Sequence, residues 1–293
     1  FSGEAEALLL DGEAVGMSFD KSGDEGVVST NQSTIWFLNW EEGDTIRILS
    51  SHSESITSIA GNSRIASAGL DNTIRIWNIE SREQELQFKC VNSACISLTL
   101  HPSLPYLLGG FDDGSLRAFE LSGKCVGVAQ VSNAVATSVM VCDEDSLVVG
   151  TSTGMMVLVM VEKWNPFTVK LLDFGRAGAY VTALDKTQNR YLLAATTEGK
   201  VSIWQKKLTG ESLLHSKMFK DSEFILADIY NVIDPEKQTL FFAHGESLEA
   251  KARFYSDGKT VLIVVKSIQS LLFRDFSSHT ITRRVSLNAY PMS

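Results

Sequence analysis

One short stretch of the chain has the residue types and spacing of a catalytic serine. Residues 150–154 read GTSTG, which matches the G-x-S-x-G pattern of the nucleophile elbow in serine hydrolases and puts Ser152 in the nucleophile's place. That elbow requires a strand, a tight turn and then a helix. The residues that follow, MMVLVMV at 155–161, favour a strand and contain no helix N-cap. We therefore interpret residues 150–154 as a turn between two strands and expect no catalytic residue there.

Two other patterns that could support chemistry have simpler explanations. DGKT at 257–260 resembles a phosphate-binding loop, but that loop needs a glycine five residues before Gly258, where Arg253 stands. We predict a hairpin turn there instead. The cysteines have no metal-ligand spacing, and we expect them to be free and mostly buried thiols. They are Cys90, Cys95, Cys125 and Cys142. The chain is therefore not expected to be an enzyme or to hold a cofactor or a metal.

Charge is unevenly distributed along the 293 residues, whose net charge is −9. Residues 1–50 contain ten acidic and two basic residues, whereas residues 250–293 contain seven basic and two acidic ones. The overall negative charge argues against a general nucleic-acid binder. No apolar run approaches the ~20 residues of a membrane-spanning helix. The chain also lacks an initiator methionine and a signal peptide, so we expect it to be a piece of a longer protein that binds neither nucleic acid nor membrane.

One phrase recurs along the chain: an apolar strand, a small polar turn and a second apolar strand. Examples are RIASAGLDNTIRIWN at 64–78 and YLLAATTEGKVSIWQ at 191–205. Aligning the last turn residue of each copy gives steps of 39, 42, 40, 45 and 70 residues. The aligned residues are Ser33, Asn72, Gly114, Gly154, Gly199 and Gln269. A period of ~40–45 residues with several short strands per unit is typical of propeller blades.

Each phrase supplies two strands, and an apolar segment before and after it supplies two more. We therefore predict an all-β propeller of about six recognisable four-stranded blades, part of a propeller of seven or more blades. The expected blades span about residues 14–53, 54–91, 92–132, 133–175, 178–219 and 249–289. The last step is too long, so we place an insertion at about 220–248. The alternative is that 224–245 supplies two strands of a degenerate extra blade. The apolar residues of this stretch either cap the propeller or bind a partner.

The second unit resembles a WD-repeat blade. The segments SH at 51–52, RIASAG at 64–69 and LDNTIRIWN at 70–78 match that family's pattern of His, Ser, Asp and Trp. The resemblance implies that His52, Ser67, Asp71 and Trp77 form a hydrogen-bonded tetrad that holds the turns of the blade to its strands. Other units keep less of the pattern: the third has Phe119 in place of the tryptophan.

A narrower resemblance, over about residues 14–290, is to the large centriolar and ciliary WD-repeat proteins of the proteome-of-centriole type. It rests on the order of successive blade phrases, such as GVVSTNQSTIWFLNW at 26–40, LQFKCVNSACISLTLHP at 86–102 and GGFDDGSLRAFEL at 109–121. It implies a non-enzymatic scaffold in the cytoplasm and cytoskeleton, at the centriole, basal body or axoneme of the cilium. Its partners would be tubulin, microtubule-wall proteins and other centriolar or ciliary proteins.

The basic last unit is the candidate contact with such an acidic partner. Its candidate residues are Lys251, Arg253, Lys259, Arg283 and Arg284. The same charges are also explained as solvated strand edges that discourage aggregation. A second function stays open, in which a generic WD-repeat adaptor presents a peptide-binding face in a ligase or trafficking complex.

Overall fold

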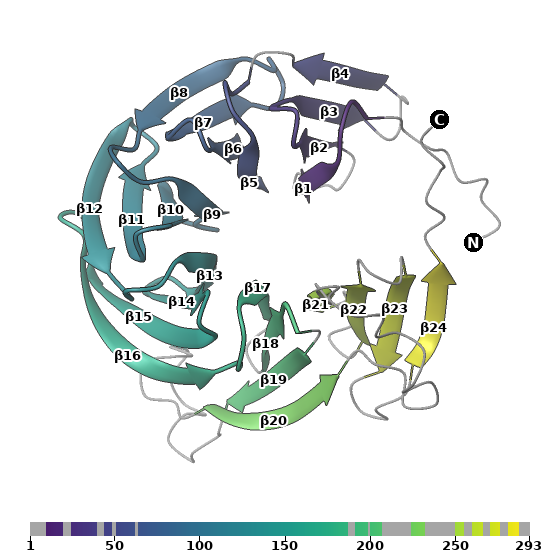
Figure 1. Ribbon diagram of the computed structural model, residues 1–293. Helices are drawn as coiled ribbons and strands as arrows, with labels where there is room; N and C mark the ends of the chain where they lie inside the picture. Colours follow the sequence, from purple (N-terminus) through teal and green to yellow (C-terminus); the bar gives the residue numbers. More distant parts are fainter. Residues whose placement is uncertain are drawn as a thin grey trace. The chain divides into compact units, whose positions relative to one another are not determined.

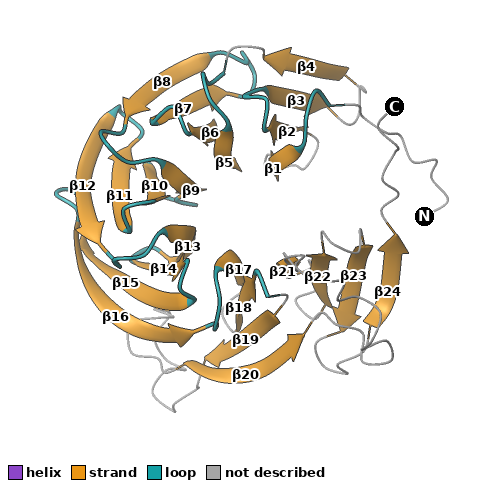
Figure 2. Ribbon diagram, viewed as in Figure 1, coloured by secondary structure: helices purple, strands orange, loops and turns teal. Residues whose placement is uncertain are grey.

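The computed structural model describes residues 10–19, 25–39, 44–48, 51–61, 64–186, 191–198, 200–206, 224–231, 250–254, 260–265, 270–275 and 281–286. For residues 44–48 and for those beyond 204, the description covers the backbone alone. Every regular element of the described part is a β-strand (Figure 2). Two compact units divide the chain: residues 1–113 with 117–126, and residues 114–116 with 127–293.

The first unit contains two complete four-stranded sheets and most of a third, each with its strands hydrogen-bonded in chain order (Figure 1). The first sheet consists of β1 (Ala14–Phe19), β2 (Glu25–Thr30), β3 (Ile35–Asn39) and β4 (Asp44–Ile48). The second consists of β5 (Ile56–Gly61), β6 (Arg64–Gly69), β7 (Thr73–Asn78) and β8 (Gln84–Lys89). The third consists of β9 (Cys95–Leu100), β10 (Tyr106–Phe111), β11 (Ser115–Glu120) and β12 (Lys124–Gln130). The first strands of these sheets, β1, β5 and β9, lie next to one another.

The second unit contains three more sheets of the same strand order. The fourth sheet consists of β13 (Ala136–Asp143), β14 (Ser146–Thr151), β15 (Met155–Lys163) and β16 (Thr168–Arg176). The fifth consists of β17 (Val181–Lys186), β18 (Tyr191–Thr196), β19 (Lys200–Lys206) and β20 (Phe224–Asn231). The sixth consists of β21 (Ala250–Phe254), β22 (Thr260–Val265), β23 (Ser270–Asp275) and β24 (Ile281–Ser286). The first strands of these sheets, β13, β17 and β21, follow one another, and each is in contact with the next.

The turn between the second and third strands of the first four sheets follows the predicted repeat. The aligned turn residues of the first four sheets, Ser33, Asn72, Gly114 and Gly154, have φ values of 64°, 58°, 77° and 79°. Positive φ is easy for glycine and tolerated by asparagine, which explains why small polar residues recur at this place. The same backbone geometry thus repeats wherever the aligned residue is described.

A β-bulge near the start of the first strand is shared by the first five sheets. In each, one residue of the first strand is left out of the register with the second strand. The residues left out are Val15, Thr57, Ile96, Thr137 and Thr182. In the sixth sheet β21 pairs with β22 in unbroken register. Among the residues whose side chains are described, the structure therefore supports five blades, while the backbone pairing gives the six four-stranded sheets predicted from the sequence.

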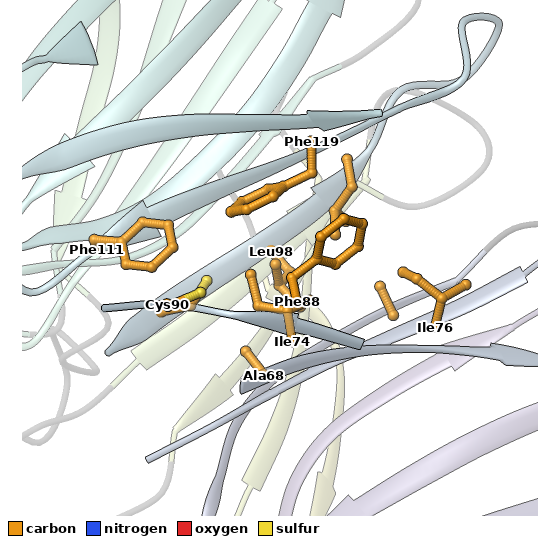
Figure 3. Packing of buried hydrophobic residues seen from close by; sticks show 11 residues of the cluster. Ala68, Ile74, Ile76, Phe88, Cys90, Leu98, Phe111 and Phe119 are labelled. Atoms are coloured by element: carbon orange, nitrogen blue, oxygen red, sulfur yellow. The ribbon is translucent and has the colours of Figure 1, made fainter. Parts of the chain in front are cut away.

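Apolar side chains between the second and third sheets form a core cluster (Figure 3). Phe88 of β8 and Phe119 of β11 lie with ring centroids 4.9 Å apart, and Phe111 of β10 lies 6.4 Å from Phe119. Ile74 and Ile76 of β7 complete the contact from the second sheet. The inner strands read as nearly continuous apolar runs because both of their faces are buried in this way.

The predicted insertion at 220–248 is wrong at its start. Residues 224–231 form β20, which pairs antiparallel with β19 and joins Leu226 to Trp204 in the register. The blade predicted at 178–219 would end instead with the apolar segment at 211–219, which lies outside the described residues, as do residues 232–249. Both segments are rich in apolar, strand-forming residues, and only the pairing with β19 distinguishes them. Residues 224–231 therefore belong to the fifth sheet and do not supply a strand to an extra blade.

Candidate functional site

Four side chains of the second sheet form one hydrogen-bonded chain near the ends of its strands. The indole Nε1–H of Trp77 donates to Ser67 Oγ at 2.9 Å, and Ser67 Oγ lies 2.8 Å from His52 Nε2. His52 Nδ1 lies 3.0 Å from both carboxylate oxygens of Asp71. Because a carboxylate only accepts, Nδ1 carries the proton and Nε2 accepts the hydroxyl proton of Ser67. The structure thus brings together His52, Ser67, Asp71 and Trp77.

Asp71 ties the turn between β6 and β7 to the loop that precedes β5. Its carboxylate accepts from the Thr73 hydroxyl at 2.7 Å, from the Thr73 backbone N–H at 3.0 Å and from the Ser53 backbone N–H at 3.1 Å. Burial alone would raise the pKa of Asp71, but the bonds from Thr73, His52 and Ser53 outweigh it and lower this pKa. The carboxylate therefore stays ionised and keeps its acceptor role.

His52 is the buried member of the pair. Burial lowers the pKa of His52 below its ordinary value of 6.5, although the hydrogen bond and the charge of Asp71 oppose the shift. The neutral imidazole is thus the form that fits the chain, since it donates through one ring nitrogen and accepts through the other. Ser67 is fully buried and Trp77 is 4% exposed, so the four residues support the fold and offer no open reacting group.

The first sheet holds a different polar cluster, which the sequence analysis missed. The Asp11 carboxylate accepts from the Thr34 hydroxyl at 2.9 Å, the Trp36 Nε1–H at 3.0 Å and the Thr30 hydroxyl at 3.2 Å. The tryptophan lies two residues after Thr34, as the second residue of β3, and not at the place that Trp77 takes in β7. The repeat pattern contains no signal for this cluster; only an aspartate close before the first strand points to it.

In the third and fifth sheets, apolar contacts or single hydrogen bonds stand in place of the chain of the second sheet. In the third sheet, Ser93 Oγ donates to Asp112 at 2.5 Å, and Phe119 fills the tryptophan's place in the core. In the fifth sheet, Trp204 Nε1–H donates to Ser202 at 3.3 Å, while its ring lies 5.5 Å from Phe174. Only the second sheet has the complete set among the described residues.

Ser152 lies in the turn between β14 and β15, with a strand on each side. Its backbone N–H donates to the Val135 carbonyl at 3.0 Å, which fastens the turn to the neighbouring loop. Gly154 is required here because its φ is 79° and a Cβ would lie 2.6 Å from the backbone nitrogen of Ala179. A helix does not follow, so the geometry of a nucleophile elbow is absent from this turn.

The predicted basic contact residues do not share one edge of the sixth sheet. Lys251 and Arg253 lie on β21, which borders the fifth sheet, whereas Arg283 and Arg284 lie on β24 at the opposite edge. Two strands separate the pairs, which corresponds to about 14 Å at ordinary strand spacing. Lys259 lies outside the described residues, as does most of the DGKT turn.

Metal binding and cysteine chemistry have little support in the described part of the chain. No group of three or more His, Cys, Asp or Glu residues there is arranged to hold a metal ion. Cys90, Cys95 and Cys142 are buried, Cys125 is exposed, and the four cysteines form no disulfide with one another. Among the described residues no helix is long and apolar enough to cross a membrane.

Comparison with known proteins indicates the fold of the chain and one repeat within it. Residues 43–78, which include β5 to β7, match the family described as WD domain, G-beta repeat. The solved beta-propeller domain of Cps50 (Swd1) from Myceliophteria thermophila superposes with a TM-score of 0.75, covering 95% of this chain and 87% of that one at 13% identity. That identity speaks for the fold alone. The chain therefore has the β-propeller fold and contains a match to a WD repeat at residues 43–78.

Two proteins of known name are similar in sequence to part of this chain. WD repeat-containing protein 90 of Homo sapiens is 32% identical over 216 residues, which cover 67% of this chain and 12% of that protein. Centriole proteome protein 16 of Chlamydomonas reinhardtii is 22% identical over 170 residues, or 40% of this chain and 8% of that protein. The chain therefore spans only a small part of the length of these relatives.

Proposed function

We propose that the chain is a non-enzymatic scaffold segment of the centriole, basal body or axoneme. The observation that carries the proposal is the similarity to Centriole proteome protein 16 and to WD repeat-containing protein 90 along a large part of the blades. The geometry supports it, because the buried polar groups of the second sheet are satisfied by one another. A stable sheet with such a polar chain is suited to hold loops in place for partners.

The proposal includes contact with tubulin or microtubule-wall proteins through the basic sixth sheet. A microtubule surface is acidic, and cationic side chains on an edge strand would be attracted to it. Because the two pairs lie on opposite edges, they are best tested apart. We expect the Arg283→Glu, Arg284→Glu variant to lose microtubule co-sedimentation more than the Lys251→Glu, Arg253→Glu variant, since β21 borders another sheet.

The matched control reverses two exposed cations elsewhere, Lys124→Glu and Lys170→Glu. This control changes net charge equally but leaves the sixth sheet intact, so we expect it to retain most of the parent's binding. Thermal unfolding of each variant verifies that the fold is kept. Equal loss in all variants, or binding that does not change as salt is raised, would contradict a contact through the sixth sheet.

The alternative is an adaptor that presents a peptide-binding face in a ligase or trafficking complex. Proximity labelling in ciliated cells separates the two functions. Centriolar and axonemal neighbours support the scaffold, whereas ligase or coat subunits support the adaptor.

A further inference from the structure

Loops at one end of the first three sheets are joined into a continuous strip by hydrogen bonds. The Ser55 hydroxyl donates to the Asn31 carbonyl at 3.1 Å, and the Leu70 N–H donates to the Ser55 carbonyl at 2.9 Å. The Cys90 N–H donates to the Asn72 carbonyl at 2.7 Å, which adds the loop between β8 and β9. The Asp112 N–H completes the strip by donating to the Ala94 carbonyl at 3.1 Å. The whole strip belongs to the first unit.

Two large apolar side chains are exposed on this strip. Leu70 is 45% exposed and Val91 is 73% exposed, the highest value among the large apolar residues of the described part. Ser55 and Ala94 accept equivalent bonds in successive sheets, so the residues three places before them, His52 and Val91, correspond. The second sheet buries a histidine at this place, whereas the third presents a valine to solvent. Neighbouring exposed apolar residues held by fixed loops are typical of a contact surface.

The charged residues in the loops of the strip are all acidic. Its loops, at 10–13, 31–34, 51–55, 70–72, 90–94 and 112–113, contain six carboxylates and no lysine or arginine. Two nearby arginines are already engaged, since Arg75 lies 3.8 Å from Asp71 and Arg117 lies 2.7 Å from Asp113. One exposed cation, Lys89, stands at the end of β8. Glu54 and Asp112 are exposed carboxylates on loops that are hydrogen-bonded to those of Leu70 and Val91.

The corresponding loops of the second unit lack this character. The described residues at 131–135, 152–154, 177–180 and 197–198 contain one carboxylate, Glu198. The acidic character is therefore absent from these described loops of the second unit and does not follow from the fold.

We infer that this acidic strip binds a segment of a partner protein in which an apolar side chain is flanked by lysine or arginine. The apolar residue covers Leu70 and Val91, and the flanking cations face Glu54 and Asp112. Nucleic acids and acidic protein surfaces are repelled by the same carboxylates. The strip thus requires a different partner from the acidic one proposed for the sixth sheet, and the inference does not depend on that proposal.

The test uses a library of short random peptides selected on the immobilised chain. We expect enriched peptides to carry lysine or arginine beside an apolar residue and to lose affinity as NaCl is raised. For the best peptide, measured by fluorescence anisotropy, the Leu70→Ser, Val91→Ser variant should bind about tenfold more weakly. The Glu54→Lys, Asp112→Lys variant should lose at least as much affinity.

The matched control is Val128→Ser, Leu171→Ser, which removes one exposed valine and one exposed leucine elsewhere, 57% and 38% exposed. It should bind like the parent. The inference is overturned if no peptide is enriched, if the enriched peptides lack basic residues, or if the Leu70→Ser, Val91→Ser variant binds within about twofold of the parent. Because both of its substitutions are at exposed positions, this variant keeps the test valid even where charge reversal impairs folding.

Discussion

At the scale of single residues, Ser67 is the centre of the polar chain in the second sheet. Its hydroxyl accepts from Trp77 and donates to His52, and the residue is fully buried. Each of these bonds replaces one that the group would make with water in the unfolded chain. A buried polar chain stabilises a fold only while every member has its partner.

Ser67→Ala should lower the free energy of unfolding by about 1–3 kcal/mol, because the indole N–H of Trp77 and His52 Nε2 lose their shared partner. Urea unfolding followed by tryptophan fluorescence measures the change. Ser29→Ala is the control: Ser29 is equally buried but makes one longer bond, 3.4 Å to the Gly16 carbonyl. Equal losses in the two variants would show that the hydrogen-bonded chain contributes nothing beyond the burial of a serine.

At the scale of elements, the shared bulge connects one sheet to the next. The Thr57 hydroxyl lies 3.1 Å from the Ala68 carbonyl of its own sheet and 2.5 Å from the Cys95 carbonyl of β9. In the fourth sheet, the Thr137 hydroxyl lies 3.2 Å from the Gly150 carbonyl and 2.7 Å from the Val181 carbonyl of β17. The bulge thus aims a threonine at the inner strand of the neighbouring sheet in both units. Thr182 takes the same place in β17.

Thr57→Val and Thr137→Val should each lower the free energy of unfolding by about 1 kcal/mol, since valine keeps the shape but removes the donor. Valine and isoleucine already occupy this place at Val15 and Ile96, so the substitution fits the backbone. Thr168→Val, at an exposed position of β16, should change stability little. Chemical denaturation of the three variants provides the comparison, and equal stability of all three would mean that the bulge threonines do not join the sheets.

At the scale of the whole molecule, the four thiols report on the folding of both units. Cys90, Cys95 and Cys142 are buried, and Cys125 is exposed. Burial raises the pKa of Cys90 to about 11 and also raises the pKa values of Cys95 and Cys142. Buried thiols with raised pKa values are poor nucleophiles, because the thiolate is the reactive form.

The native chain should therefore react quickly with a thiol reagent at one of its four cysteines and slowly at the other three. Mildly alkaline buffer without denaturant shows the fast phase, and addition of urea releases the rest. Cys125→Ser should abolish the fast phase and leave the slow one. A fast phase that survives this substitution would place another thiol at the surface of the native protein.

The repeat was readable from the sequence because its cause is local. Positive φ at Ser33, Asn72, Gly114 and Gly154 restricts the turn to small residues, and burial on both faces makes the adjoining strands apolar. The set of His52, Ser67, Asp71 and Trp77 came from the resemblance of the second unit to a WD-repeat blade, and the structure brings the four side chains together. The edges of the sheets were less predictable, because an outer strand pairs on one side only and many segments satisfy that demand.

The sequence by itself determined the all-β class and the turns, since these depend on backbone sterics and on residues close along the chain, while the residues of the polar chain followed from the resemblance to a WD-repeat blade. Only the tertiary structure decided which segment completes the fifth sheet, how the basic residues divide between β21 and β24, and that Val91 stands where the second sheet buries His52. These features depend on pairing and burial between residues far apart in the chain, where segments of similar composition compete and the free energy of contact selects one.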